Sequence, residues 1–219
     1  MDSVERYLRT ETRRHFFGKA ALGLGMPALT WLLSRNAAAA PATAERTGGI
    51  PGIPHFAMSF GLTRNGEPVA GVVYNRITDE LFAADRGGGA YLNDRRIRVS
   101  GRRDIHDAVI ACGIPHRGRG DAVKFRGELA QVQAKATGIR RAGTASLDLA
   151  WVAAGRLDGF WERGLKPWDI CAGIVLVREA GGFCADIDGA GDVMATGNIM
   201  AGNEHMSKQL GDCLKAAKV

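Results

Sequence analysis

Apolar and polar residues alternate between residues 55 and 100, which is the pattern of strands that turn one face toward a core. The clearest turn is Arg64-Asn65-Gly66-Glu67, because Asn-Gly between two apolar runs favours a tight β-hairpin. Another turn is expected at Asn93-Asp94, and Gly87-Gly88-Gly89 is interpreted as a bend rather than a phosphate-binding loop. This stretch is therefore predicted to be an antiparallel meander. Its predicted strands are 55–63, 68–75, 81–84, 90–93 and 96–99.

After residue 100 the pattern changes to helices that alternate with short strands. Gly181-Gly182 is expected to end a helix that begins near Asp169. The alternation predicts an α/β fold in which a sheet is packed between helices. The predicted helices cover 121–136, 146–154, 169–180 and a terminal segment from Asn203, and the predicted strands cover 108–112, 139–141, 183–186 and 199–201.

Residues 1–42 differ in composition from the rest of the chain. Arg13-Arg14 precedes an apolar run at 20–33, which is too short to span a ~30 Å hydrocarbon core, and small residues follow. This order is typical of a twin-arginine export signal, and the alternative is a helix of the folded domain. We expect residues 1–42 to be a signal segment and linker, without a stable membrane span, and 43–219 to be the folded domain. The protein would be periplasmic if the signal works and cytoplasmic otherwise.

The composition limits the classes of protein and of function that fit the chain. The chain has 219 residues, 46% hydrophobic and 24% charged, which suits one globular domain. Its net charge of +6 comes from scattered arginines and not from a basic stripe with aromatic residues, so no nucleic-acid binding is expected. The cysteines lack the spacing of a zinc site and are expected to be buried free thiols, although export would permit disulfides. They are Cys112, Cys171, Cys184 and Cys213.

Residues 140–182 carry the candidate chemistry. Gly143-Thr144-Ala145-Ser146 is a small polar turn before an apolar run, so its free backbone N–H groups would face an anionic or polyol ligand. Asp169, near the start of the next helix, and Glu162, on a short aromatic strand, offer the hard oxygen atoms that divalent cations prefer. A single carboxylate such as Asp169 cannot hold a catalytic metal without further acidic ligands. The pattern therefore indicates half of an active site.

Each of these residues also has a structural interpretation. Asp169 could cap its helix, because Asp is a preferred N-cap, and Glu162 could be an exposed charge on a strand. Trp151, Trp161 and Trp168 are expected to be core or pocket-wall residues rather than residues that stack on a ligand. The remaining acids and histidines that are interpreted as solvated, capping or structural are Asp148, Asp158, His55 and His116.

Several short segments between residue 52 and the C-terminus form a recognisable set. They are Gly52-Ile53-Pro54-His55-Phe56, Gly71-Val72-Val73-Tyr74, Leu92-Asn93 with 96–100, Gly143-Thr144-Ala145, Gly155-Arg156-Leu157-Asp158, and Pro167-Trp168-Asp169 with Glu179-Ala180-Gly181-Gly182. In order and spacing, the set resembles the inositol monophosphatase family. The resemblance implies a layered αβαβα fold and a magnesium-dependent phosphomonoesterase, which uses metal-activated water to hydrolyse an inositol or sugar phosphate.

The resemblance also implies roles for individual residues. Asp169 matches the aspartate that binds the metal, and it is the expected catalytic residue. Glu162 matches the acid that hydrogen-bonds a substrate hydroxyl group. Gly143, Thr144 and Ala145 match the turn that lines the substrate, so with Glu162 and Asp169 they form the expected substrate site. The implied cofactor is Mg²⁺, and the implied ligand is a small phosphorylated polyol or sugar.

The chain departs from the family pattern ahead of Gly52. The family has an Asp-Pro-Leu-Asp-Gly-Thr motif there and a Glu-Glu pair further upstream, whereas residues 41–47 contain no aspartate and only Glu45 as an acid. We therefore expect an N-terminally truncated family domain that binds Mg²⁺ weakly and hydrolyses its substrate poorly. A sheet left uncovered at its edge and face is expected to favour a homodimer or other association.

Other functions stay open at this point. Within the same chemistry, the chain could be a nucleotide bisphosphate phosphatase or a histidinol-phosphate phosphatase. From a different class, it could be a non-catalytic binding or interaction protein that is derived from the same fold.

Overall fold

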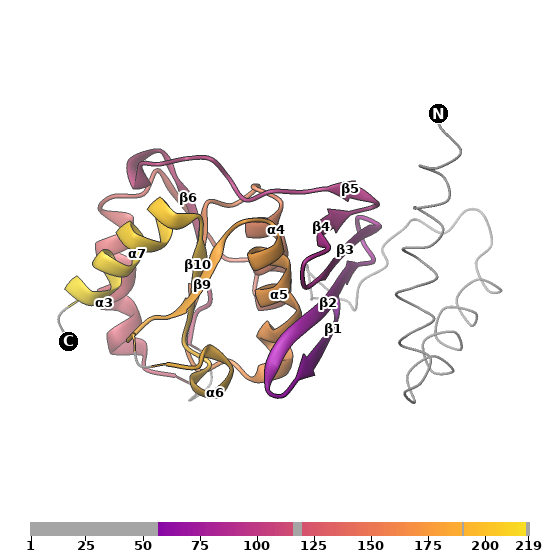
Figure 1. Ribbon diagram of the computed structural model, residues 1–219. Coiled ribbons are helices and arrows are strands. Elements are labelled where there is room, and N and C mark those ends of the chain that lie inside the picture. The colour runs from indigo at the N-terminus through magenta and orange to yellow at the C-terminus, as the bar shows by residue number, and fades with distance from the viewer. Residues whose placement is uncertain (1–56, 116–119, 190, 218–219) are drawn as a thin grey trace, which may run out of the picture. The chain divides into compact units, whose positions relative to one another are not determined.

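The structure is a computed structural model that describes residues 57–115, 120–189 and 191–217 (Figure 1). The chain divides into two units, Met1–Thr47 and Gly48–Val219, and all of the described residues belong to the second. The predictions for the signal segment 1–42, Glu45, His55 and His116 lie outside the described residues. Among the residues that are described, no helix has the length and apolar character needed to cross a membrane.

The predicted meander is confirmed. It is an antiparallel sheet in the order β1-β2-β3-β4-β5. Asn65 and Gly66 have φ angles of 53° and 83°, and Asn93 and Asp94 have φ angles of 47° and 65°. These angles are those of the tight hairpin turns that the sequence predicted. The strands are β1 (Ala57–Arg64), β2 (Glu67–Asn75), β3 (Glu80–Asp85), β4 (Gly89–Leu92) and β5 (Arg95–Arg96).

The predicted strand at 96–99 is wrong beyond Arg96. The Ile97 N–H still donates to the carbonyl oxygen of Ala90 at 2.9 Å, but the Val99 N–H donates to the carbonyl oxygen of Ala180 at 3.2 Å. The chain therefore leaves the meander and runs beside the end of helix α5 (Pro167–Glu179). Ile97 and Val99 both pack against the core, which explains why their alternation looked like a strand.

The second sheet contains all the strands that were predicted after residue 100. Its order is β7-β6-β8-β10-β9, with β6 parallel to β7 and β8, and β10 antiparallel to β8 and β9. The short helices η1 (Ile105–Asp107) and α6 (Val193–Thr196) were not predicted. The strands of this sheet are β6 (Val109–Cys112), β7 (Gly138–Arg140), β8 (Gly159–Glu162), β9 (Phe183–Asp186) and β10 (Ile199–Gly202).

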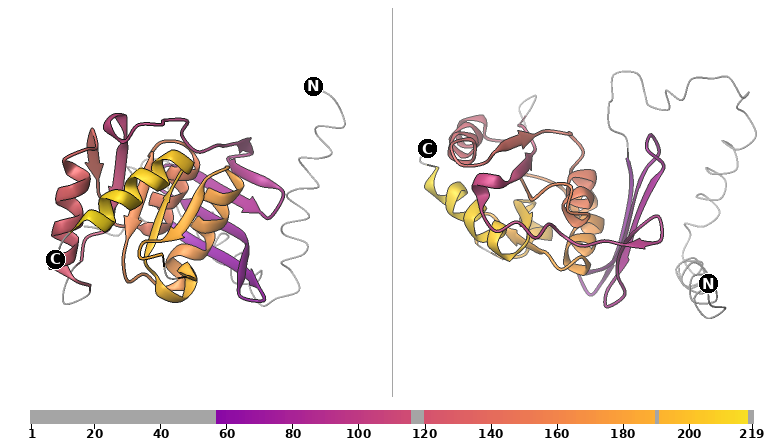
Figure 2. Two further views of the ribbon diagram at one scale, coloured as in Figure 1. Left: turned by 60° about the vertical axis from the view of Figure 1, so that its left-hand side comes forward. Right: turned by 90° about the horizontal axis from the view of Figure 1, so that it is seen from above.

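The elements form layers, as the sequence predicted (Figures 1 and 2). Helices α4 (Ala145–Ala153) and α5 lie between the two sheets. Helices α3 (Ala122–Gln133) and α7 (Glu204–Ala216) cover the opposite face of the second sheet. The described residues therefore form a β-α-β-α stack, which confirms the layered α/β fold.

Helix α5 fits between the sheets because its whole circumference is apolar or small. Residues 170–177 are all buried, as expected for a helix that contacts protein on every side. Strand β2 approaches it closely at Gly71, where a Cβ atom would lie 2.6 Å from backbone atoms of Ala172. The described thiols are free: Cys112, Cys171 and Cys213 are buried and Cys184 is half-buried.

Candidate functional site

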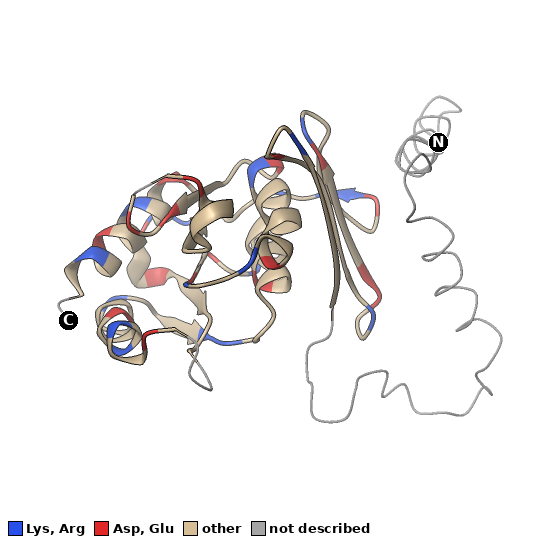
Figure 3. Cartoon of the chain, turned by 90° about the horizontal axis from the view of Figure 1, so that it is seen from below, with Lys and Arg blue, Asp and Glu red and all other residues tan. Residues whose placement is uncertain are grey.

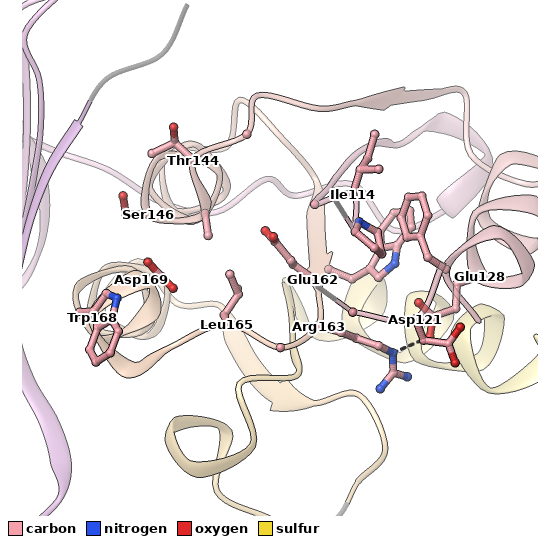
Figure 4. A pocket seen from close by; sticks show the side chains of 18 of the residues that line it. Ile114, Asp121, Glu128, Thr144, Ser146, Glu162, Arg163, Leu165, Trp168 and Asp169 are labelled. Atoms are coloured by element: carbon pink, nitrogen blue, oxygen red, sulfur yellow. Dashed lines mark hydrogen bonds and ion pairs between the residues drawn. The ribbon is translucent and has the colours of Figure 1, made fainter. Parts of the chain in front are cut away.

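A cavity of about 390 Å³ opens between the first turns of helices α4 and α5 and the end of strand β8. Glu162 and Asp169 face the same space, with Thr144 and Ser146 beside them (Figure 4). The structure thus brings together every residue of the predicted substrate site, although their roles stay predictions. The members of that site that line the cavity are Gly143, Thr144, Ala145, Glu162 and Asp169.

The turn before α4 presents the beginning of a helix to this cavity. Gly143 has a φ of 86°, which favours glycine, and Thr144 follows as the extended N-cap residue. The Thr144 side chain makes no capping hydrogen bond in the helix. The first backbone N–H groups of α4 therefore form a partly positive end of the helix beside the cavity, which suits an anionic group.

Glu162 lies at the end of β8, next to Gly113. Parallel pairing aligns Cys112 with Trp161, so the residue after each of them is also adjacent. A Cβ atom on Gly113 would lie only 1.8 Å from the carboxyl carbon of Glu162. Glycine at 113 therefore leaves the space that the Glu162 carboxyl group occupies, and sequence reasoning missed this requirement.

The environment of Glu162 favours its protonated form. Burial, followed by the negative charge of Asp169, raises the pKa of Glu162 to about 7, against the opposing effect of Arg141. Near neutral pH this carboxyl group can therefore either accept a hydrogen bond from a ligand hydroxyl group or donate one to a ligand oxygen. That chemistry suits a polyol.

The interpretation of Asp148 as a solvated acid is wrong, because the residue is only 1% exposed. The alternative interpretation as a capping acid is compatible with the hydrogen bond that it receives from the backbone of Thr144, the N-cap residue of α4. Burial, followed by the charge of Glu162, raises the pKa of Asp148 to about 7, while a hydrogen bond from the Thr144 backbone and the charge of Arg141 oppose the shift. Asp148 is the only charged residue within the α4 sequence, ASLDLAWVA, and that isolation in an apolar helix was the available signal.

Asp158, interpreted in the same way, is also buried, with 5% of its side chain exposed. Its Oδ2 accepts the Val109 N–H at 2.8 Å, and its Oδ1 lies 3.3 Å from the Arg102 Nε. It therefore anchors the start of strand β6, which is a structural role.

Asp169 is the third residue of α5, and one of its oxygen atoms has a structural partner. Its Oδ2 accepts the backbone N–H of Lys166 at 2.9 Å, which closes a capping box at the start of the helix. The capping interpretation is therefore correct in part, and it is compatible with a second role because Asp169 also lines the cavity.

The described residues do not by themselves complete a protein-held Mg²⁺ site. In the ranges 57–115, 120–189 and 191–217, no three His, Cys, Asp or Glu side chains gather closely enough to hold a metal ion. Mg²⁺ requires a nearly octahedral shell of oxygen atoms. Among the described residues that line the cavity near the starts of α4 and α5, Asp169 and Glu162 supply two carboxyl groups, which are too few for such a shell.

The far end of the cavity is closed by an ion-pair network (Figure 4). The Arg163 Nε donates to the buried Glu128 Oε1 at 2.7 Å, and its Nη1 donates to Asp188 Oδ2 at 2.6 Å. Two carboxylates thus balance the charge of this guanidinium group. The α4 end of the cavity is consequently the better place for an anion.

The tryptophans behave as the sequence predicted. Trp161 is 1% exposed and stacks on Phe125 with ring centroids 6.3 Å apart, so it belongs to the core. Trp168 is 72% exposed and lines the cavity wall. Trp151 is half-buried and packs against the core.

Comparisons with known proteins agree with this geometry. The model of the inositol monophosphatase family matches residues 47–217. The inositol-1-monophosphatase of Mesorhizobium japonicum is 55% identical over 172 residues, which are 78% of this chain and 64% of that protein. The Nus factor SuhB of Escherichia coli K12 is 44% identical over 164 residues, which are 75% of this chain and 61% of that protein.

Solved structures agree as well. The extragenic suppressor protein suhB of Bartonella henselae has a TM-score of 0.73 at 54% identity, covering 76% of this chain and 64% of that one. An inositol monophosphatase from Anabaena has a TM-score of 0.69 at 37% identity, covering 75% of this chain and 66% of that one. The chain spans a little under two thirds of the length of the first curated relatives it matches, at 64%. The match over most of its own length shows that the chain belongs to the inositol monophosphatase family.

Proposed function

We propose that the cavity binds the phosphate monoester of inositol or of a sugar. The observation that carries this proposal is that the start of α4, Glu162 and Asp169 converge on one cavity. Backbone N–H groups at the start of α4 suit phosphate oxygen atoms, and the Glu162 carboxyl group suits a hydroxyl group. Gly143 and Ala145 carry little side chain, so a polyol ring can approach the backbone closely.

We further propose that hydrolysis by this chain is weak. Magnesium-assisted hydrolysis needs several oxyanions around the metal, and the described residues offer Asp169 as the one ligand that the family resemblance supports. Asp169 also uses one oxygen atom for the Lys166 N–H. On these residues, the chain would bind its phosphorylated ligand more readily than it turns it over.

Calorimetric titration of the full chain with myo-inositol 1-phosphate tests the binding, and release of inorganic phosphate with added Mg²⁺ tests the turnover. We expect measurable binding that Glu162→Gln weakens by about tenfold, because the amide keeps one acceptor and one donor but loses the ionised state in which both oxygen atoms accept hydrogen bonds from ligand hydroxyl groups. We expect phosphate release far below the typical enzyme range of about 1–1,000 s⁻¹. Asp169→Asn should abolish any release that is seen, since Asn keeps the helix cap but loses the charge.

Glu204→Gln, in the first turn of α7, is the matched control because it changes a carboxylate outside the cavity. Rapid Mg²⁺-dependent turnover would contradict the weak hydrolysis, and failure to bind any phosphate monoester would contradict the binding. Titrating a nucleoside bisphosphate and histidinol phosphate in parallel separates the two alternative phosphatases. Each of these would bind more tightly than inositol 1-phosphate if it were the true ligand.

A second candidate is a non-catalytic interaction protein. It is favoured by the sparse metal ligands among the described residues and by relatives that are named Nus factor SuhB, at 44% identity. The same titration decides between the two candidates. A folded chain that neither binds nor hydrolyses any of these phosphate esters would support the interaction protein.

A further inference from the structure

The loop 163–166 connects the two acids of the candidate site. It begins directly after Glu162, at the end of β8, and it ends where Asp169 closes the capping box of α5. Residues 163–165 line the cavity together with both acids. A change in the path of this loop would therefore change the spacing and the direction of the two carboxyl groups.

Arg163 fastens the loop by three charge-assisted hydrogen bonds. Its Nε donates to the Glu128 Oε1 at 2.7 Å, and its Nη1 and Nη2 donate to the two carboxylate oxygen atoms of Asp188 at 2.6 and 2.9 Å. Helix α3 carries residues of both signs (Figure 3), and Glu128, its only acid, is the one that meets Arg163. Every nitrogen atom of the guanidinium group thus has a carboxylate partner, which holds the side chain in one orientation.

The ion pairs of Arg163 are largely shielded from water. The side chain of Glu128 is 1% exposed and that of Arg163 is 17% exposed. The hydrogen bond from Arg163 lowers the pKa of Asp188, so this carboxylate is ionised at neutral pH. A planar guanidinium group can bind two carboxylates at once, whereas lysine offers a single point charge. Arginine is therefore the residue that suits this position.

The backbone of the loop is fastened as well. The Gly164 N–H donates to the Asn198 Oδ1 at 3.1 Å. The Leu165 N–H donates to the carbonyl oxygen of Gly197 at 3.0 Å, and a Cβ atom on Gly197 would lie only 2.0 Å from the Leu165 carbonyl oxygen. The Asn198 Nδ2 lies 3.5 Å from the Asp188 Oδ2, which joins these backbone contacts to the ion pairs.

We propose that Arg163 is a positioning residue, which fixes the loop and so holds Glu162 and Asp169 in place for a ligand. At the end of the loop, the Lys166 N–H donates to the Asp169 Oδ2 at 2.9 Å, so the loop also orients that carboxyl group. Two carboxylates already balance the charge of Arg163, so it acts through its neighbours and not by touching the ligand. The effect on a ligand rests on the proposed function, whereas the effect on the loop does not.

Amide hydrogen exchange of the full chain without ligand tests the effect on the loop. In Arg163→Leu, the amides of residues 164–166 should exchange about tenfold faster or more than in the wild type, since the loop loses its side-chain anchor. The amides of β10 should keep their rates. Arg102→Leu is the matched control, because it breaks an ion pair with the buried Asp158 outside the cavity.

Calorimetric titration tests the effect on a ligand. Arg163→Leu should weaken the binding of myo-inositol 1-phosphate by about tenfold and that of inorganic phosphate by less than about twofold. The reason is that the start of α4 suits the phosphate group, whereas Glu162 suits the hydroxyl groups of the ring. Adding Glu162→Gln to Arg163→Leu should weaken binding no further than either change alone, because both remove the same contact. Arg163→Lys should restore part of the affinity.

Unchanged exchange at residues 164–166 in Arg163→Leu, or the same acceleration in Arg102→Leu, would overturn the proposal. Equal weakening of both ligands, additive losses in the double variant, or faster exchange with unchanged binding would overturn it too, since each indicates a merely structural role. If the wild type binds neither ligand, the proposed function fails, and the exchange rates still decide whether Arg163 positions the loop.

Circular dichroism establishes that each variant is folded. Asp188→Ala replaces Arg163→Leu if the latter does not fold, because it removes two of the three hydrogen bonds of Arg163 and leaves the buried pair with Glu128 intact. It should accelerate exchange at the same amides by a smaller factor. Exchange in Asp188→Ala as slow as in the wild type would refute the proposal.

Discussion

The two sheets differ in their surroundings, although both are largely apolar on both faces. The second sheet has α4 and α5 on one side and α3 and α7 on the other, so Phe160 and Ile110, which point to opposite faces, are both fully buried. The meander has α4 and α5 on one face, and Phe60, which points to the opposite face, is 53% exposed. The comparison teaches that apolar strands do not by themselves determine burial, because the described elements cover both faces of the second sheet but only one face of the meander.

The sharpest test of this comparison uses one substitution at two places. Phe160→Ala should lower the free energy of unfolding by about 3–5 kcal/mol, because it leaves a cavity between packed layers. Phe60→Ala should lower it by less than about 1 kcal/mol in the monomer, since half of that ring is already in contact with water. Urea denaturation at low protein concentration measures both values. Similar losses at the two positions would mean that the two sheets are equally covered.

Much of the fold could be predicted because the signals are local. Asn65-Gly66 and Asn93-Asp94 encode tight turns through their positive φ angles, and the sequence places them between apolar runs. The segment 97–99 could not be predicted, because its alternation reflects packing against the core after the chain has left the sheet. The alternation of apolar and polar residues indicates which side chains are buried. Whether the backbone also forms hydrogen bonds to a neighbouring strand depends on the tertiary structure.

The candidate site also contains some residues that the sequence predicts and others that it does not. The turn at Gly143 and the helix start at Asp169 have sequence signatures, and family resemblance supplied their proposed roles. Gly113 has no such signature, because its role depends on a residue far away in the chain, and the signal for Asp148 was its isolation in an apolar helix. Gly113 is set by the Glu162 carboxyl group, and the burial of Asp148 is set by the layers around α4.

The second prediction concerns Asp148, the acid that is buried on helix α4. Burial raises the pKa of Asp148 from its ordinary value of 3.8 to about 7 in the folded chain. The stability that its protonated form contributes is therefore complete below about pH 4 and is lost as the pH rises through 7. Asp148→Asn keeps the shape without the charge. It should therefore raise the free energy of unfolding by about 2 kcal/mol at pH 8 and change it little at pH 4.

Thermal melts across this pH range provide the measurement. Asp158→Asn is the control, because Asp158 is equally buried but pairs with Arg102 and accepts the Val109 N–H. It should lower the melting temperature instead of raising it. An Asp148→Asn variant that is less stable than the wild type at pH 8 would show that the helical layer tolerates the ionised acid.

The smallest expected effect lies where the two regions join. Glu179, the last residue of α5, accepts the backbone N–H groups of Gly87 and Gly89, each at 2.9 Å, and so ties the helix to the turn between β3 and β4. Glu179→Gln retains one acceptor oxygen and brings an amide N–H group against the other donor. The free energy of unfolding should fall by about 1 kcal/mol.

Hydrogen exchange distinguishes this loosening from a general loss of stability. The amides of Gly87 and Gly89 should exchange faster in Glu179→Gln, while those of β8 and β10 keep their protection, because the layers around the second sheet do not depend on this contact. Glu67→Gln is the matched control, since Glu67 is exposed and lies 3.8 Å from its partner Arg178. If the second sheet lost protection to the same extent as the turn, the meander and the second sheet would open as one unit. Their different surroundings would then have no consequence for local stability.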